Sequence, residues 1–150
     1  MRWSARKQRI ASQLHEIEQA RKSAAEALLA GARAELAEAG RVRAESEDAL
    51  DSAERGWRDH LSSKSFDLEL GQAFAAQLME QQRELELSQD SESRADMAAA
   101  DARQGWQKAE ASVRLGERVV QRGRNRLAKQ SERARDSELA DRTAWKWFSR

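Results

Sequence analysis

Two histidines offer the most versatile chemistry in this sequence, because an imidazole can bind a metal ion or transfer protons near neutral pH. His15 and His60 lie far apart along the chain, and the sequence contains no cysteine. Neither histidine therefore has the partners of a zinc site. The 26 Asp and Glu residues would need a desolvating pocket to tune their pKa values. We expect no enzyme activity, no metal and no cofactor.

A basic stretch, Arg114–Arg135, is the next candidate. Its start, "RLGERVVQRGRNR", lacks the G-x-x-x-x-G-K-[ST] pattern of a phosphate-binding loop. A solvated helix surface and a site for an acidic protein surface are the two main interpretations. Nucleic acid is a weaker one, since acidic residues are interspersed and the pI is about 8.1, lower than is typical of such domains.

The sequence ends near a cluster of aromatic residues, Trp145, Trp147 and Phe148. An exposed aromatic cluster usually marks an interface, so these residues are a candidate interface tail. Two alternatives remain open. The cluster could pack against the chain start near Trp3, or form a membrane-surface foot with Lys146 and Arg150.

The composition indicates which elements position these residues. Charged residues make up 35% of the 150 residues, and proline is absent. Ala, Glu, Arg, Leu and Gln dominate, which is typical of long helices and coiled coils. No signal peptide and no membrane-spanning run is apparent. The sequence predicts an all-α cytoplasmic protein.

A seven-residue repeat predicts the second helical arm. Apolar residues recur at alternating steps of four and three from Phe74, a pattern that produces a left-handed coiled coil. Ala and Gly occupy several of these seam positions, so the seam should be weak and should gain order with a partner. The seam positions are Phe74, Leu78, Gln81, Leu85, Ser88, Glu92, Ala95, Ala99, Ala102, Trp106, Ala109, Val113, Gly116, Val120, Gly123, Leu127, Gln130, Ala134, Ser137 and Asp141.

In the first arm, the spacing of apolar residues predicts two seam registers, displaced by one residue at Leu28–Leu29. The seam positions of the first register are Ile10, Leu14, Ile17, Ala24 and Leu28, and those of the second are Leu29, Leu36, Ala39, Leu50, Ala53, Trp57 and His60. A serine-rich stretch follows and predicts a reversal. We therefore predict one antiparallel hairpin domain over residues 1–150, with arm one at about 5–61, a turn at about 62–70 and a longer, overhanging arm two at about 71–147.

A hairpin of this kind also predicts which residues of the two arms face each other. If the turn centres near residue 66, facing residue numbers add to about 132, and arm two overruns arm one beyond about residue 125. Two Gly–Trp pairs, at Gly56–Trp57 and Gly105–Trp106, occupy the seam seven heptads apart. Trp57 should lie near Phe74, and Trp106 should fill room left at the slip. The basic chain ends should meet at one end of the hairpin, opposite an acidic turn end.

Three segments carry a resemblance to a known family. They are "WRDHL" at Trp57–Leu61, "FAAQL" at Phe74–Leu78, and the helical segment that begins "GWQKAEAS" at Gly105. In these segments and in its length and layout the chain resembles the FliJ/YscO family, the stalk proteins of flagellar and injectisome type III export systems.

The resemblance implies a non-enzymatic coiled coil that couples a hexameric export ATPase to the export gate at the inner membrane and also interacts with export chaperones. A generic coiled-coil adaptor is the alternative. The resemblance places the gate contacts at the tip, at Leu50, Trp57, Phe74 and Leu78. It places the ATPase contacts at the basic end, at Arg2, Arg6, Lys7, Arg9, Arg118, Arg122, Arg124, Arg126 and Lys129.

Overall fold

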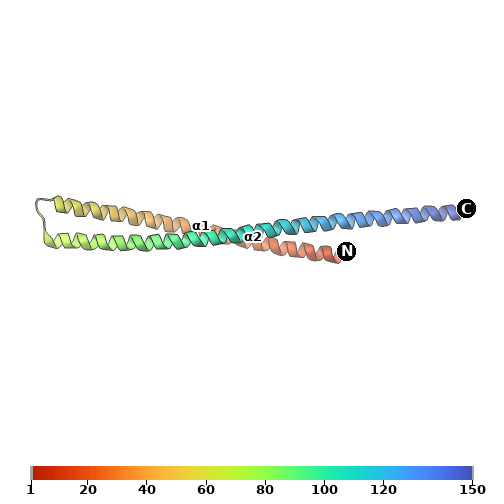
Figure 1. Cartoon of the computed structure of the whole chain (residues 1–150), viewed down its shortest axis with the longest axis horizontal. Helices are drawn as coiled ribbons and strands as arrows, with labels where there is room; N and C mark the ends of the chain where they lie inside the picture. The colour runs from red at the N-terminus through yellow and green to blue at the C-terminus, as the bar shows by residue number, and fades with distance from the viewer. Residues whose placement is uncertain (1, 150) are drawn as a thin grey trace. The chain divides into compact units, whose positions relative to one another are not determined.

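The computed structural model describes residues 2–149 and contains two long α-helices. Helix α1 spans Ala5–Ser62 (58 residues) and α2 spans Leu68–Phe148 (81 residues) (Figure 1). The predicted all-α fold of two long helices, with the second the longer, is confirmed. Neither helix contains proline, so nothing in the sequence breaks the backbone hydrogen bonding. Among the described residues, no helix combines the length and apolar character needed to cross a membrane.

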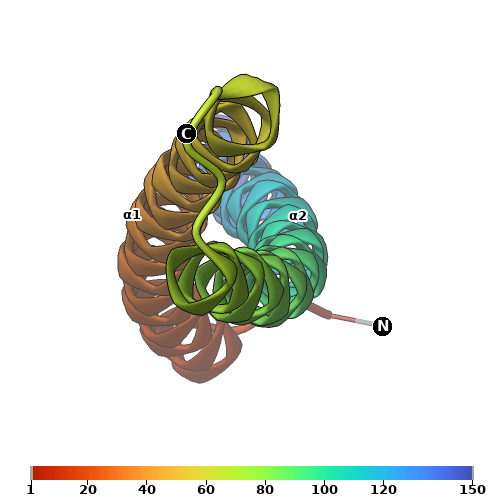
Figure 2. The same cartoon turned by 90° about the vertical axis from the view of Figure 1, so that its left-hand side faces the viewer.

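The chain divides into two compact units. Unit 2 comprises residues 26–105 and contains the turn, and unit 1 comprises residues 1–25 and 106–150. Within each unit, α1 and α2 run antiparallel and side by side (Figures 1 and 2). Both helices contribute to both units, because neither is interrupted at the boundary.

Short polar residues determine where the helices begin. The Ser4 side chain accepts a hydrogen bond from the Lys7 amide (3.2 Å), which caps α1. Asp67 caps α2 by accepting a hydrogen bond from the Glu69 amide (2.9 Å). Because Asp67 starts α2 this early, the connection is limited to residues 63–67, shorter than the predicted turn at 62–70.

The predicted seam of α2 is largely confirmed. From Phe74 to Gln130 every seam position is at least partly buried, whereas all described residues from Ser131 onward are exposed. The overhang therefore begins about five residues later than predicted. Its last predicted seam positions, Ala134, Ser137 and Asp141, face solvent.

The predicted register slip in α1 is wrong. One seam with regular steps of three and four runs from Gln8 to His60 and includes Leu29. The second predicted register belongs to this seam, whereas Ile10, Leu14, Ile17, Ala24 and Leu28 are exposed. The seam residues in their place are Gln8, Ala11, His15, Glu18, Lys22 and Ala25.

Glycines in α2 explain why polar residues of α1 can occupy the seam. A Cβ atom on Gly116 would lie 3.0 Å from His15 Nδ1, so the missing side chain leaves room for the imidazole. Gly123 makes room for Gln8 in the same way. These glycines had appeared only to weaken the seam, but each accommodates a large polar side chain from α1.

Facing positions agree with the predicted pairing in both units. His15 faces Gly116 in unit 1, and Gly56 faces Phe74 in unit 2. The residue numbers of such pairs add to about 131, close to the predicted 132. The apolar core is thin, because the described apolar residues that are buried are Leu29, Ala53, Ala99 and Val120.

Candidate protein-binding surfaces

The turn end of unit 2 contains a packed aromatic cluster, which we call the tip cluster: Trp57, His60, Phe66 and Phe74. The His60 ring lies 5.2 Å from the ring of Phe66 and 5.3 Å from that of Phe74, measured between centroids. Two glycines let the rings approach the helices. A Cβ atom on Gly71 would lie 3.2 Å from Phe66 and 3.6 Å from Trp57, which places both rings over this glycine, and a Cβ atom on Gly56 would lie 3.1 Å from Phe74.

His60 connects this cluster to the turn. Its imidazole is buried, at 8% exposure, and its Nε2 hydrogen-bonds to the Asp67 carbonyl oxygen at 3.0 Å. Two further hydrogen bonds order the turn, from the Ser63 amide to the His60 carbonyl (3.2 Å) and from the Ser65 amide to the Ser63 hydroxyl (3.3 Å). His60 therefore has a structural position at the end of the seam, as the heptad pattern indicated.

The predicted tip contacts lie in the seam rather than on the surface. Their side chains are only partly exposed, so each has a packing role: Leu50, Trp57, Phe74 and Leu78. The exposed apolar side chains at the turn are instead Leu61, Phe66, Leu68 and Leu70. Figure 2 views unit 2 from this end. The serine-rich stretch predicted only a turn here, although apolar residues in such a loop and outside the heptad are a signal for an exposed binding surface.

The start of α1 is held against α2 in unit 1 by a tryptophan and a glutamine. Trp3 Nε1 donates to Gln8 Oε1 at 2.8 Å, and Gln8 Nε2 donates to the Val120 carbonyl at 3.1 Å. Both side chains lie over Gly123, where a Cβ atom would come within 2.6 Å of Trp3 Nε1. Only glycine allows this close approach.

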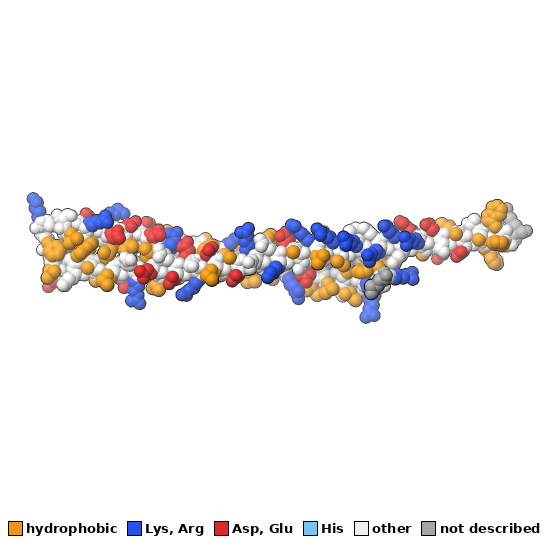
Figure 3. All heavy atoms as spheres, in the orientation of Figure 1, with side chains coloured by type: hydrophobic (Ala, Val, Ile, Leu, Met, Phe, Trp, Pro, Cys, Tyr) orange, Lys and Arg blue, Asp and Glu red, His pale blue; other side chains and the backbone are white. Residues whose placement is uncertain are grey.

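The basic residues predicted to contact the ATPase all belong to unit 1. Lys7 is partly buried and donates through Nζ to the Arg2 carbonyl at 3.3 Å. The other predicted members are exposed: Arg2, Arg6, Arg9, Arg118, Arg122, Arg124, Arg126 and Lys129. Figure 3 shows Lys and Arg side chains gathered over the paired part of this unit.

An open apolar groove of about 500 Å³ lies between the two helices of unit 1. Large apolar side chains form its walls, and small seam residues, Ala11 and Gly116, form its floor. The wall residues are Trp3, Ile10, Leu14, Leu115 and Val119. We call this feature the groove. The heptad pattern did not predict the groove, because Ile10 and Leu14 were expected to lie in the seam.

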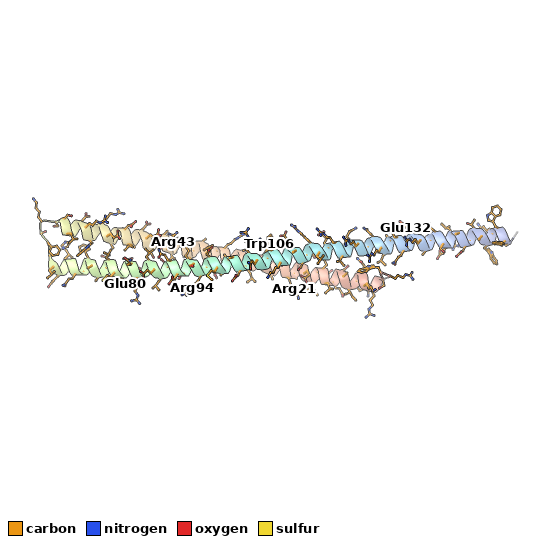
Figure 4. All side chains as sticks on the ribbon, viewed as in Figure 1. Arg21, Arg43, Glu80, Arg94, Trp106 and Glu132 are labelled. Atoms are coloured by element: carbon orange, nitrogen blue, oxygen red, sulfur yellow. The ribbon has the colours of Figure 1, made fainter. Side chains whose placement is uncertain are left out.

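Unit 2 has a different electrostatic character. It carries nine Lys and Arg residues and eighteen Asp and Glu residues. Two of its arginines, both on α1, form ion pairs with glutamates. Arg41 pairs with Glu38 (2.5 Å) and with Glu45, and Arg43 pairs with Glu47 (2.7 Å) and with Glu92 of α2. Arg43 is labelled in Figure 4.

These ion pairs affect proton binding. The hydrogen bond from Arg41, together with its positive charge, lowers the pKa of the Glu38 carboxyl below its ordinary value. The hydrogen bonds from Arg43 to Glu47 and then to Glu92 raise the pKa of the guanidinium. Both groups are on the helix surface, so the effect on stability is small.

The aromatic tail is exposed. Trp145, Trp147 and Phe148 lie on the unpaired stretch of α2 in unit 1, which also includes Glu132, labelled in Figure 4. Trp147 is 76% exposed. The alternative that the cluster packs against the chain start is wrong, because Trp3 packs on Gly123 instead. Arg150, part of the membrane-foot alternative, lies outside the described residues.

The two Gly–Trp pairs differ in structure. Trp57 belongs to the tip cluster, and Gly56 gives Phe74 room. Trp106 is partly buried, as its seam position predicts, but the slip that was expected to accommodate it does not exist. Gly105 is exposed and has open space around it, because a Cβ atom there would meet no atom within 4 Å. It therefore relieves no crowding.

The segments that resemble the FliJ/YscO family occupy both units. "WRDHL" and "FAAQL" belong to unit 2, on either side of its turn, and the segment that begins at Gly105 continues from Trp106 into the part of α2 that belongs to unit 1. Comparisons of the chain with protein-family models, curated proteins and solved structures found no match.

Proposed function

We propose that this protein is a non-enzymatic stalk of a type III protein export apparatus, flagellar or injectisome, located in the cytoplasm at the inner-membrane export machinery. Unit 1 binds the hexameric export ATPase, and the turn end of unit 2 binds the cytoplasmic domain of the export gate. By binding both, the protein couples ATP hydrolysis to the gate. Export chaperones are further partners that the family resemblance suggests.

One observation carries this proposal: the two units differ in charge, and each exposes its own apolar surface. The paired part of unit 1, residues 1–25 and 106–130, carries thirteen Lys and Arg residues against four Asp and Glu residues, whereas unit 2 carries nine against eighteen. Complementary charge selects partners and accelerates their encounter. Two surfaces of opposite character therefore suit two different partners.

The exposed turn surface of unit 2 supports a second binding event at the tip. Leu61 and Leu68 are exposed there, although no seam requires apolar residues at either position. The tip cluster beneath them supplies a rigid platform, because its rings are packed against each other and against glycines. A preorganised apolar surface binds with a smaller entropic cost than a mobile one.

The test uses the export ATPase and the gate domain encoded in the same genome, each in a separate binding assay with the full-length protein. Reversing two charges in unit 1 (Arg118→Glu with Arg122→Glu) should reduce ATPase binding by about tenfold or more. Exposed charges at an interface guide the association of the two proteins, and reversed charges would repel the partner. Gate binding should not change. Stimulation of ATP hydrolysis should be lost together with ATPase binding.

The complementary variant changes the tip. Leu61→Ser with Leu68→Ser should weaken gate binding and leave ATPase binding intact, because both side chains are exposed at the turn. Met79→Ser is the matched control, since Met79 is an exposed apolar residue of α2 within the same unit. If the unchanged protein binds neither partner, the stalk proposal is wrong. If the two variants have exchanged effects, the assignment of partners to units is wrong.

A generic coiled-coil adaptor is the second candidate, and the groove favours it. An open apolar groove between two helices suits a partner helix of many kinds. The same assays separate the two functions. An adaptor outside the export system would bind a helical partner without binding the export ATPase or stimulating it.

A further inference from the structure

A second apolar stripe runs along α1 beside the seam. Ile10, Leu14 and Ile17 are separated by steps of four and three, and Trp3 precedes Ile10 by seven residues. None of the three aliphatic residues belongs to the seam, and Leu14 is 56% exposed. A stripe with a heptad period is the pattern of a helix that packs against another helix. Helix α2 already packs against the seam of α1, so within residues 2–149 no helix covers this stripe.

Helix α2 contributes a matching stripe on the other side of the groove. Leu115 and Val119 are four residues apart and also lie outside the seam. Leu115 is 63% exposed. Together with Ile10 and Leu14, they wall the groove, whose floor is formed by Ala11 and Gly116. Side chains of a third helix fit between such ridges when they recur every three or four residues.

The charge around the groove defines the complementary partner. On α2, Arg122 and Arg126 continue the steps of three and four set by Leu115 and Val119, and both are exposed. On α1, Lys7 belongs to the groove lining. Glu18 also lines the groove, but its carboxylate is paired with Arg21 at 3.2 Å. A partner helix would thus meet apolar side chains flanked mainly by cations.

Two occupants from this protein itself fit less well. In a second copy, the same paired part of unit 1 would bring its own excess of nine positive charges against the groove. The overhang of α2, residues 131–150, has five Lys and Arg residues and four Asp and Glu residues, so it offers little charge complementarity. A helix rich in Asp and Glu is favoured over both.

We propose that the groove of unit 1 binds one acidic amphipathic α-helix of a partner protein and thereby completes a local three-helix coiled coil. The helix supplies apolar residues at i, i+3 or i+4, and i+7, with carboxylates on its flanks to pair with the surrounding cations. This goes beyond the proposed function and does not depend on it, because the groove binds such a helix whichever protein carries it.

The test uses a defined probe with the full-length protein. The probe is a fluorescent synthetic helical peptide with leucines at heptad a and d positions and glutamates at its other exposed positions. Two matched peptides serve as controls: one with lysine in place of each glutamate, and one with the same composition in scrambled order. The acidic striped peptide should bind at least about tenfold more tightly than either control, measured by fluorescence anisotropy, and its affinity should fall with added salt.

Variants locate the binding site. Leu14→Ser with Leu115→Ser should weaken binding of the acidic striped peptide by about tenfold or more, because both side chains wall the groove. Met97→Ser changes an exposed apolar residue of unit 2 and should leave binding unchanged. Circular dichroism of each variant should show that the helices are retained, since the substituted side chains are exposed.

Three outcomes would overturn the proposal. In the first, the scrambled peptide binds as tightly as the striped one, which would indicate general charge attraction. In the second, the groove variant binds the striped peptide as tightly as the unchanged protein. In the third, the protein forms a concentration-dependent dimer in sedimentation that the groove variant abolishes, which would make the groove an interface between two copies of the chain.

Discussion

The two units are built on the same heptad pattern but use it differently. In unit 2 both helices place large apolar residues in the seam, among them Leu29 and Leu78, and Trp57 and Phe74 contribute to the tip cluster at the turn. In unit 1 the α1 seam is made largely of small or polar residues such as Ala11 and His15, and large residues such as Leu14 lie beside it. The period of a seam alone therefore does not decide which side chains it buries.

The charges follow the same division. Unit 2 is acidic and holds Arg41 and Arg43 in ion pairs with glutamates, whereas the paired part of unit 1 has about three cations for every carboxylate. A surplus of one sign repels itself and is retained at some cost in stability, which is offset when a partner neutralises it. The surplus is nine charges in both, but it is spread over 50 residues in the paired part of unit 1 and over 80 residues in unit 2. Because its charge density is higher, the paired part of unit 1 should depend on partners and on salt more than unit 2.

The largest expected change in stability follows from removing the Trp57 side chain from the tip cluster. Trp57→Ala should lower the free energy of unfolding by about 2–4 kcal/mol, because a large seam side chain is removed without a replacement. Urea unfolding followed by circular dichroism measures the change. Trp147→Ala is the control, since Trp147 is exposed, and should change stability by less than about 0.5 kcal/mol. Equal losses in the two variants would contradict the contrast between a packed and an exposed tryptophan.

A smaller loss is expected at the start of unit 1. Gly123→Ala places a Cβ atom against Trp3 and Gln8, so the hydrogen bond from Gln8 to the Val120 carbonyl should break. We expect a cost of about 1–2 kcal/mol, as for overpacking elsewhere. Hydrogen exchange should become faster in the first turns of α1 and remain unchanged near Phe74. Unaltered exchange at the start of α1 would show that Gly123 is not needed for this approach.

Substituting a glycine that has open space around it should raise the stability rather than lower it. Gly105→Ala should raise stability by about 1 kcal/mol, because glycine is unfavourable within a helix and a Cβ atom there meets nothing within 4 Å. The thermal midpoint should rise by roughly 2–4 °C for a chain of this size. Gly31→Ala, at a second position where a Cβ atom meets nothing, repeats the measurement. A fall in the midpoint at both positions would show that these glycines relieve strain in the helices.

The smallest effect concerns the surface ion pairs of unit 2. Because Arg41 lowers the pKa of Glu38 in the folded state, the pair stabilises the fold above the unfolded-state pKa of this glutamate, and the contribution is lost as the pH falls through the folded-state pKa. Arg41→Gln should raise the pKa of Glu38 towards its ordinary value, measured by NMR titration of the side-chain carboxyl. A pKa of Glu38 that stays the same in the variant would show that the pair does not form in solution.

The seam of α2 was predictable residue by residue, and that of α1 was only partly so. In α2, apolar residues such as Leu78, Leu85 and Val120 mark a single period. In the first half of α1, the apolar residues Ile10, Leu14 and Ile17 predict a seam that the structure does not use. The sequence cannot reveal that glycines at 116 and 123 leave room for His15 and Gln8, because this depends on which residues face each other across the pair.

The exposed surfaces were predictable to different degrees. The aromatic tail lies beyond the end of α1, so the difference in arm lengths alone predicted that residues such as Trp147 lack a partner from arm one. The apolar surface at the turn was missed, because Phe66 and Leu68 are separated from the heptad by the serine-rich segment. The groove was missed as a direct result of the wrong register in α1.

The sequence by itself determined the two helices, their antiparallel pairing, the approximate turn and the unequal distribution of charge. These properties follow from local helix propensity, from the seven-residue period and from composition, and none of them requires knowledge of facing residues. The tertiary structure alone decided which of two adjacent stripes in the first half of α1 is buried, the aliphatic one or the one made of small and polar residues. The aliphatic stripe stays exposed, because Gly116 and Gly123 of α2 leave room for His15 and Gln8 of the other stripe.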